Sequence, residues 1–200
     1  MDRRGYRTIA GGAFLAVATL LLLGFVTAAA QYPGYSATTQ TISALGAAEA
    51  TGRSRAIFNG TMILAGLGTL VATYGLHQRF RNRGFTVALA ATGIGNAGVG
   101  VFPAETGVPH VLAAMLAFGG IGCTALLVAR EVGGPFGALS ASVGVLELVV
   151  LVLFITVGGS TPLGLGGLER WVAYLGILWA AAFGGYLLPG SEPAEPGDGL

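Results

Sequence analysis

The stretch that decides the fold is SVGVLELVVLVLF, residues 142–154, in which one carboxylate, Glu147, interrupts an otherwise apolar run. The whole chain has the same character, because 54% of its 200 residues are hydrophobic and only 10% are charged. Soluble domains carry about 25% charged residues, and a soluble fold with so few would expose large apolar patches. The sequence therefore predicts an integral membrane protein.

Six segments approach the length that a helix needs to cross a bilayer, which is about 20 mostly apolar residues. They are residues 9–29, 57–76, 85–102, 111–129, 136–158 and 171–188. All six should be helical, because open strands cannot satisfy their backbone groups in lipid. We expect an all-α bundle of six transmembrane helices over residues 1–188. Residues 189–200 are acidic and rich in proline and glycine, and they should form a disordered tail.

The distribution of arginine predicts the orientation, because cytoplasmic loops carry an excess of basic residues. If six spans alternate, one side holds Arg3, Arg4, Arg7, Arg79, Arg81, Arg83 and Arg130, and the other holds Arg53, Arg55 and Arg170. Both termini should then lie on the cytoplasmic side of the cell membrane. An alternative for the first segment is a cleaved signal sequence, since AAAQ at residues 28–31 resembles a cleavage site. We favour retention, because the apolar run is close to spanning length.

Two polar residues are expected within the membrane. Glu147 is near the middle of the fifth span, and Asn96 is in the third. Intramembrane acids are costly, usually face the bundle interior, and often mark a functional site. No basic residue lies within a predicted span to pair with Glu147, so we expect its carboxyl to be protonated. Asn96 is a candidate hydrogen-bond partner, and the alternative to a functional site is a simple bridge between two helices.

A second polar cluster is expected at the outer rim of the bundle. The connections and helix starts on that side carry Tyr35, Ser36, Ser43, Asn59, Glu105 and His110. These six residues are candidates for ligand binding. The competing interpretation is that they cap helices and anchor the chain at the interface.

The segment QYPGYSATTQTISALG, residues 31–46, predicts a short interfacial helix between the first two spans. Pro33 and Gly34 indicate a turn, after which Ser36 can cap a helix N-terminus. One face of this helix would then carry residues at three- and four-residue spacing, namely Tyr35, Thr38, Ile42 and Leu45. The apolar face is too modest for another span, so the helix should lie at the outer membrane surface.

Several common sites are disfavoured. The motif GIGNAG, residues 93–98, matches a dinucleotide fingerprint, but that fingerprint works only between a strand and a helix N-terminus. Within a spanning helix it predicts close helix packing instead.

A catalytic zinc is disfavoured because His77 and His110 should lie on opposite sides of the membrane. We expect no metal and no cofactor. The net charge of +1 gives no nucleic-acid footprint, so membrane lipid is the expected partner.

Three short motifs carry a resemblance to a known family. YPGYSATTQTISALG, RAIFNGTMILAGL and FPAETGVPH resemble an uncharacterised prokaryotic integral membrane family, domain of unknown function 998. The positions that carry it are Tyr35, Ser36, Ile42, Ser43, Leu45, Gly46, Phe58, Asn59, Phe102, Pro103 and His110. The resemblance extends over nearly the whole chain except the tail. It implies an architecture of about six spans and adds no reaction.

Three functions fit this sequence. The first, which we favour, is binding of a lipid or small amphiphile in an outward-facing polar cavity, with the rim candidates at its mouth and Asn96 and Glu147 at its floor. The second is a lipid-acting hydrolase or transferase, with Ser36 or Ser43 as nucleophile and His110 as base. The third is a small proton-coupled transporter that uses Glu147.

Overall fold

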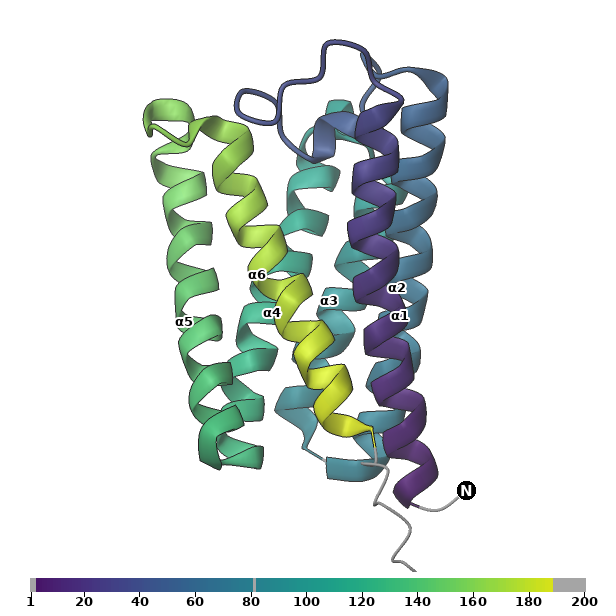
Figure 1. Cartoon of the computed structure of the whole chain (residues 1–200), viewed down its shortest axis with the longest axis vertical. Helices are drawn as coiled ribbons and strands as arrows, with labels where there is room; N and C mark the ends of the chain where they lie inside the picture. The colour runs from purple at the N-terminus through teal and green to yellow at the C-terminus, as the bar shows by residue number, and fades with distance from the viewer. Residues whose placement is uncertain (1–2, 81, 189–200) are drawn as a thin grey trace, which may run out of the picture.

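The computed structural model describes residues 3–80 and 82–188, which form a bundle of six long α-helices (Figure 1). The helices are α1 (Arg3–Ala30), α2 (Gly52–Phe80), α3 (Arg83–Val101), α4 (Val108–Val132), α5 (Gly134–Thr156) and α6 (Gly164–Leu187). Three short 3-10 helices lie in the connections: η1 (Ser43–Gly46), η2 (Ala104–Thr106) and η3 (Gly158–Ser160). The described residues contain no strand, so the all-α prediction is confirmed. The tail predicted at residues 189–200 lies outside the described residues.

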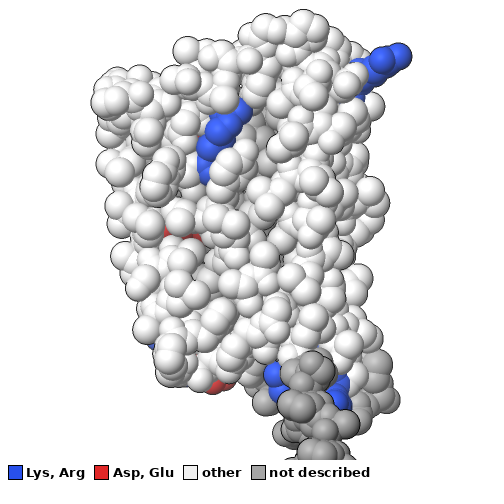
Figure 2. Space-filling model, in the orientation of Figure 1, with Lys and Arg blue, Asp and Glu red and all other residues white. Residues whose placement is uncertain are grey.

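Five of these helices, α1 to α5, are long and apolar enough to cross a membrane. The chain is therefore a multi-pass membrane protein. Helix α6 is 24 residues long, but Glu169, Arg170 and several glycines lower its mean hydropathy. Figure 2 shows the corresponding surface on one face, where basic side chains gather toward the two ends and the broad band between them is almost uncharged.

The helices alternate in direction and form a closed ring. Each helix packs against the next one along the chain, and α6 returns to pack against α1. The connections α1–α2, α3–α4 and α5–α6 therefore share one end, which we call the loop end. The described chain begins and finishes at the opposite end, which we call the terminal end (Figure 1). This arrangement places a space inside the ring that all six helices border.

The glycine motif at residues 93–98 is a packing surface within α3, as the sequence predicts. Gly95 faces α4, where an added Cβ would lie 2.6 Å from the carbonyl oxygen of Ala113. Gly93 faces α2, where a Cβ would lie 3.1 Å from the carbonyl oxygen of Gly66. Only small residues allow helix backbones to approach this closely. Asn96 lies between these two contact faces and is 9% exposed.

The connection between α1 and α2, residues 31–51, differs from the predicted interfacial helix, and we call it the outer loop. Its beginning matches expectation, since the Thr39 amide donates to Ser36 Oγ and the Gln40 amide donates to the Ser36 carbonyl. The helix does not continue beyond this turn, and only the 3-10 helix η1 follows. The prediction of an interfacial helix from Ser36 was therefore wrong.

The reason is tertiary. The carbonyl oxygens that would extend a helix accept hydrogen bonds from α6 instead: Arg170 donates to Ala37 and Gln40, and the Gly166 amide donates to Thr38. The loop is also drawn into the bundle rather than lying flat on it. Ile42 and Leu45 are 4% and 1% exposed and belong to the same apolar core as Phe25.

Candidate functional site

A cavity of about 80 Å³ lies inside the ring of helices. All six helices and the outer loop contribute to its walls, which are mainly aromatic and aliphatic. Its polar residues are Ser43, Thr69, Thr92, Asn96, Glu147 and Glu169. An apolar cavity that accepts benzene has a volume of about 150 Å³, so this one has room for a few atoms in its present form. The cavity is apolar rather than polar, which corrects the expectation from the sequence.

Glu147 is the one α5 residue among those that line the cavity. Its side chain is 1% exposed, and neither carboxyl oxygen has a hydrogen-bond partner among the described residues. It reaches the cavity past Gly176 of α6, where an added Cβ would lie 3.0 and 3.1 Å from the two carboxyl oxygens. The absence of a side chain at Gly176 is thus what admits the carboxyl.

Asn96 is not the partner of Glu147, contrary to the sequence-based suggestion. Both residues line the cavity, but the unpaired carboxyl oxygens show that no hydrogen bond joins them. The reason is the order of the helices around the ring, because α4 stands between α3 and α5. The two polar groups are therefore presented to a shared space rather than to each other.

Glu169 closes the loop end of the same cavity. It is 3% exposed, at the start of α6, and its carboxylate accepts hydrogen bonds from the Ile42 amide and from the Ser43 hydroxyl. These contacts fix the outer loop against α6 and hold Ile42 in the core. Glu169 therefore resembles Glu147 in burial and location but differs in having its acceptors occupied.

Arg170 holds the outer part of the same loop. Its Nη1 donates to the carbonyl oxygens of Ala37, Gln40 and Gly166 at 2.6, 3.1 and 2.8 Å. Its Nη2 donates to the Tyr35 hydroxyl at 2.5 Å, and the guanidinium carbon lies 5.4 Å from the centroid of the Tyr35 ring. A planar guanidinium can bind several acceptors at once because it presents five donors in a fixed geometry. We call Glu169, Arg170 and their loop partners the latch.

Tyr35 completes the latch as a neutral phenol. It accepts from Arg170 and donates to the Thr41 carbonyl oxygen at 2.7 Å, which a phenolate could not do. Burial raises the pKa of Tyr35, and nearby Arg170 opposes this in part. A raised pKa in the folded state means that the contribution of Tyr35 to stability is present below its usual pKa of about 10. That contribution is lost only as the pH rises through the raised value.

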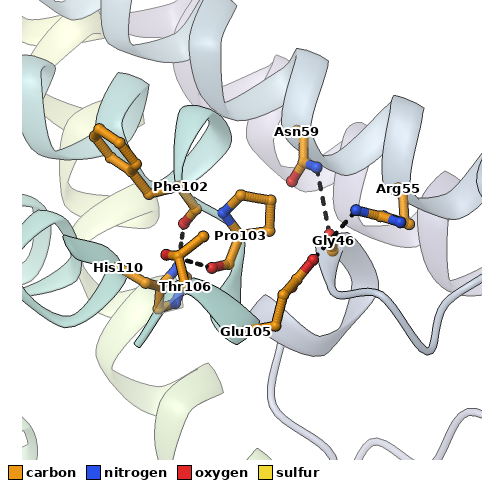
Figure 3. A network of polar contacts seen from close by, with 8 residues as sticks. All are labelled: Gly46, Arg55, Asn59, Phe102, Pro103, Glu105, Thr106 and His110. Carbon is orange, nitrogen blue, oxygen red and sulfur yellow. Dashed lines mark hydrogen bonds and ion pairs between the residues drawn. The ribbon is translucent and has the colours of Figure 1, made fainter. Parts of the chain in front are cut away.

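A second polar network lies at the loop end between α2 and the α3–α4 connection (Figure 3). Arg55 and Glu105 form an ion pair at 3.2 Å. The Asn59 amide donates to the Gly46 carbonyl oxygen at 3.3 Å, and His110 Nδ1 lies 2.8 Å from the carbonyl oxygen of Phe102. These contacts tie η1 and η2 to the helix ends.

The six rim candidates thus separate into three groups. Ser43 lines the cavity, whereas Tyr35 and Ser36 lie in the outer loop outside it. Asn59, Glu105 and His110 belong to the network of Figure 3 and do not line the cavity either. All six residues lie at the loop end, but they do not form a single binding site.

The serine–histidine pair of the hydrolase hypothesis is not assembled. Ser43 Oγ donates to Glu169, Ser36 Oγ accepts from Thr39, and His110 is paired with the carbonyl of Phe102. A general base must lie within hydrogen-bond reach of the nucleophile whose proton it takes. Neither serine has that relation to His110 among the described contacts, and the geometry therefore gives no support to acyl-transfer chemistry.

Glu169 and Arg170 are the site residues that the sequence-based candidates omitted. Their signal in the sequence is an adjacent acid and base at the head of an apolar segment. That pattern is ordinary at a helix start facing water. Only the fold shows that the Glu169 side chain points into the bundle while Arg170 donates hydrogen bonds to the outer loop.

The fold and the cavity define an all-α multi-pass membrane protein with a cavity between its helices. Comparison with known families identifies it further: the model of the family described as "Protein of unknown function (DUF998)" matches residues 9–186. The chain belongs to this family. No curated protein and no solved structure matches it.

Proposed function

We propose that this protein binds a small amphiphile in the central cavity. The observation that carries the proposal is Glu147, a buried carboxyl with two unpaired oxygens that lines an apolar cavity. Ligand sites are typically apolar cavities with a few polar groups that fix the ligand's orientation. The walls would hold the apolar part of the ligand, and Asn96 and Glu147 would bind its polar group.

The topology that accompanies this function has six spans and cytoplasmic termini in the cell membrane. Helix α6 lies inside the same ring as the other five and, at 24 residues, is long enough to cross. Among the described residues, the terminal end carries six arginines and the loop end carries three, which favours placement of the terminal end in the cytoplasm. The outer loop and the latch then face outward, so a ligand would enter from that side.

The latch explains how entry would be controlled. The cavity of about 80 Å³ is well below the roughly 300 Å³ of ordinary ligand pockets. Any amphiphile larger than a few atoms therefore requires the loop end to open. Ile42 and Ser43 are the loop residues that line the cavity, and Glu169 holds both. Release of this one carboxylate would uncover the cavity.

Packing at the terminal end favours binding over transport. Phe14 lines the cavity, and Trp179 and Phe183 pack against it with ring centroids 5.1 to 6.3 Å apart. All three side chains are at most 3% exposed. The Trp179 Nε1 also donates to Ser140 Oγ at 3.0 Å. This closely packed aromatic cluster supports binding over transport.

Native mass spectrometry of the full chain, purified in mild detergent, tests the proposal. We expect a retained small molecule in the wild type. Ala173→Leu and Ala117→Leu each fill the cavity from a different helix, and both should lose the molecule. Leu178→Phe enlarges a 60% exposed residue of α6 and serves as the control that keeps it. Repeated absence of any bound molecule in the wild type, or its retention in both filled variants, would contradict the proposal.

A further inference from the structure

The cavity presents hydrogen-bond acceptors that no protein donor occupies. Both carboxyl oxygens of Glu147 are buried and unpaired, while those of Glu169 accept from the outer loop. Buried polar atoms in folded proteins nearly always have partners, and a buried polar group left without its hydrogen bonds carries an uncompensated desolvation cost. A ligand that donates to Glu147 would remove this cost. We propose that the cavity is specific for primary alkylamines, with the amine nitrogen bound at Glu147; this inference rests on the proposed function.

The charge of the lining favours an amine over an acid. The titratable residues that line the cavity are Glu147 and Glu169, and among the described residues no arginine, lysine or histidine joins them. Arg170 lies next in sequence to Glu169, but its guanidinium is engaged by the outer loop. A carboxylate ligand would meet two acids and no base. A cationic or donor-rich group would meet two carboxyl groups and no base.

The shape of the lining favours a primary amine on an alkyl chain. Gly176 leaves a gap at which Glu147 enters, and an added Cβ there would already lie 3.0 Å from a carboxyl oxygen. The carboxyl is therefore closely packed on its α6 side, which favours an unbranched nitrogen over a bulkier polar group. The rest of the cavity lining is mainly apolar and includes Met62, Phe118 and Ile177. A short hydrocarbon chain can extend along these walls toward the loop end.

Two probes of the same shape separate the polar group from the apolar body. We would titrate 4,4,4-trifluorobutylamine and 4,4,4-trifluorobutanol into the detergent-solubilised full chain and follow binding by fluorine NMR, with empty micelles as the blank. A hydrogen bond to a charged partner is worth about 1.5–3 kcal/mol, so the amine should bind about tenfold tighter or more. In Glu147→Gln the two probes should bind with nearly equal affinity.

A second pair of variants tests the geometry without removing the carboxyl. Gly176→Ala places a methyl group against Glu147 and should reduce the preference for the amine. Gly185→Ala, on the same helix, has nothing within 4 Å of the added Cβ and should retain it. Equal binding of both probes by the wild type would overturn the amine inference while leaving amphiphile binding intact. So would an unchanged amine preference in Glu147→Gln. Binding of neither probe would count against both proposals.

Discussion

The two ends of the cavity carry the same chemical group in opposite situations. At the loop end, Glu169 is buried and its oxygens accept from the Ile42 amide and the Ser43 hydroxyl. In the middle of the bundle, Glu147 is equally buried and its oxygens have no partner among the described residues. The difference shows that burial of an acid does not by itself indicate a binding site. The unoccupied acceptors distinguish Glu147, whereas Glu169 holds the structure together.

This difference has an energetic consequence. Removing Glu169 would leave a buried amide and a hydroxyl without an acceptor, which costs the desolvation of each group. Removing Glu147 would leave nothing unpaired, because nothing donates to it. Burying a polar group without a hydrogen bond is costly, so replacing it with an apolar group of similar size should be neutral or stabilising. The two acids should therefore respond to mutation in opposite directions.

The largest effect should come from Glu169→Ala. Loss of the acceptor for Ile42 and Ser43 should lower the free energy of unfolding by about 3 kcal/mol, since two donors lose their partner. Chemical unfolding of the purified protein in detergent would measure it. Glu169→Gln keeps one acceptor oxygen and should fall between the wild type and Glu169→Ala. A Glu169→Ala protein as stable as the wild type would show that the latch does not stabilise the fold.

A smaller effect should come from Arg170→Lys, which keeps the charge and loses the planar set of donors. The outer loop should open more often, with a loss of about 1–2 kcal/mol in latch stability. A Ser36→Cys reporter in a Cys123→Ser background would show this as about tenfold faster labelling by a water-soluble maleimide. The same reporter with native Arg170 is the control. Unchanged labelling would mean that hydrogen bonds to Arg170 do not hold the loop.

The smallest change in stability, and one of the opposite sign, should come from Glu147→Leu. The substitution removes an unpaired carboxyl from an apolar cavity, so the free energy of unfolding should stay the same or rise by about 1 kcal/mol. Unfolding under the conditions used for Glu169→Ala gives the direct comparison. A loss of 2 kcal/mol or more (on the scale of a broken buried interaction) would mean that Glu147 has a structural role and that the contrast between the two acids is false.

The sequence by itself determined the membrane class, the six helices and the positions of the polar residues. Length and apolar character fix a spanning helix, because lipid offers no partners for an open backbone. The sequence also singled out Glu147, since a carboxylate in an apolar run is conspicuous. The sequence also identified the glycine motif at residues 93–98 as a packing surface. The motif lies within a spanning helix, and this setting excluded a nucleotide site.

Only the tertiary structure decided what those polar residues contact. Local spacing predicted a helix from Ser36, but Arg170 and Gly166 took the carbonyl groups that would have extended it. Nothing near Glu169 in the sequence shows that it turns inward to the loop, and nothing near Glu147 shows that Gly176 makes room for it. Hydrogen bonds between residues more than 120 positions apart arise when the ring of helices closes. A pattern within a single segment carries no information about them.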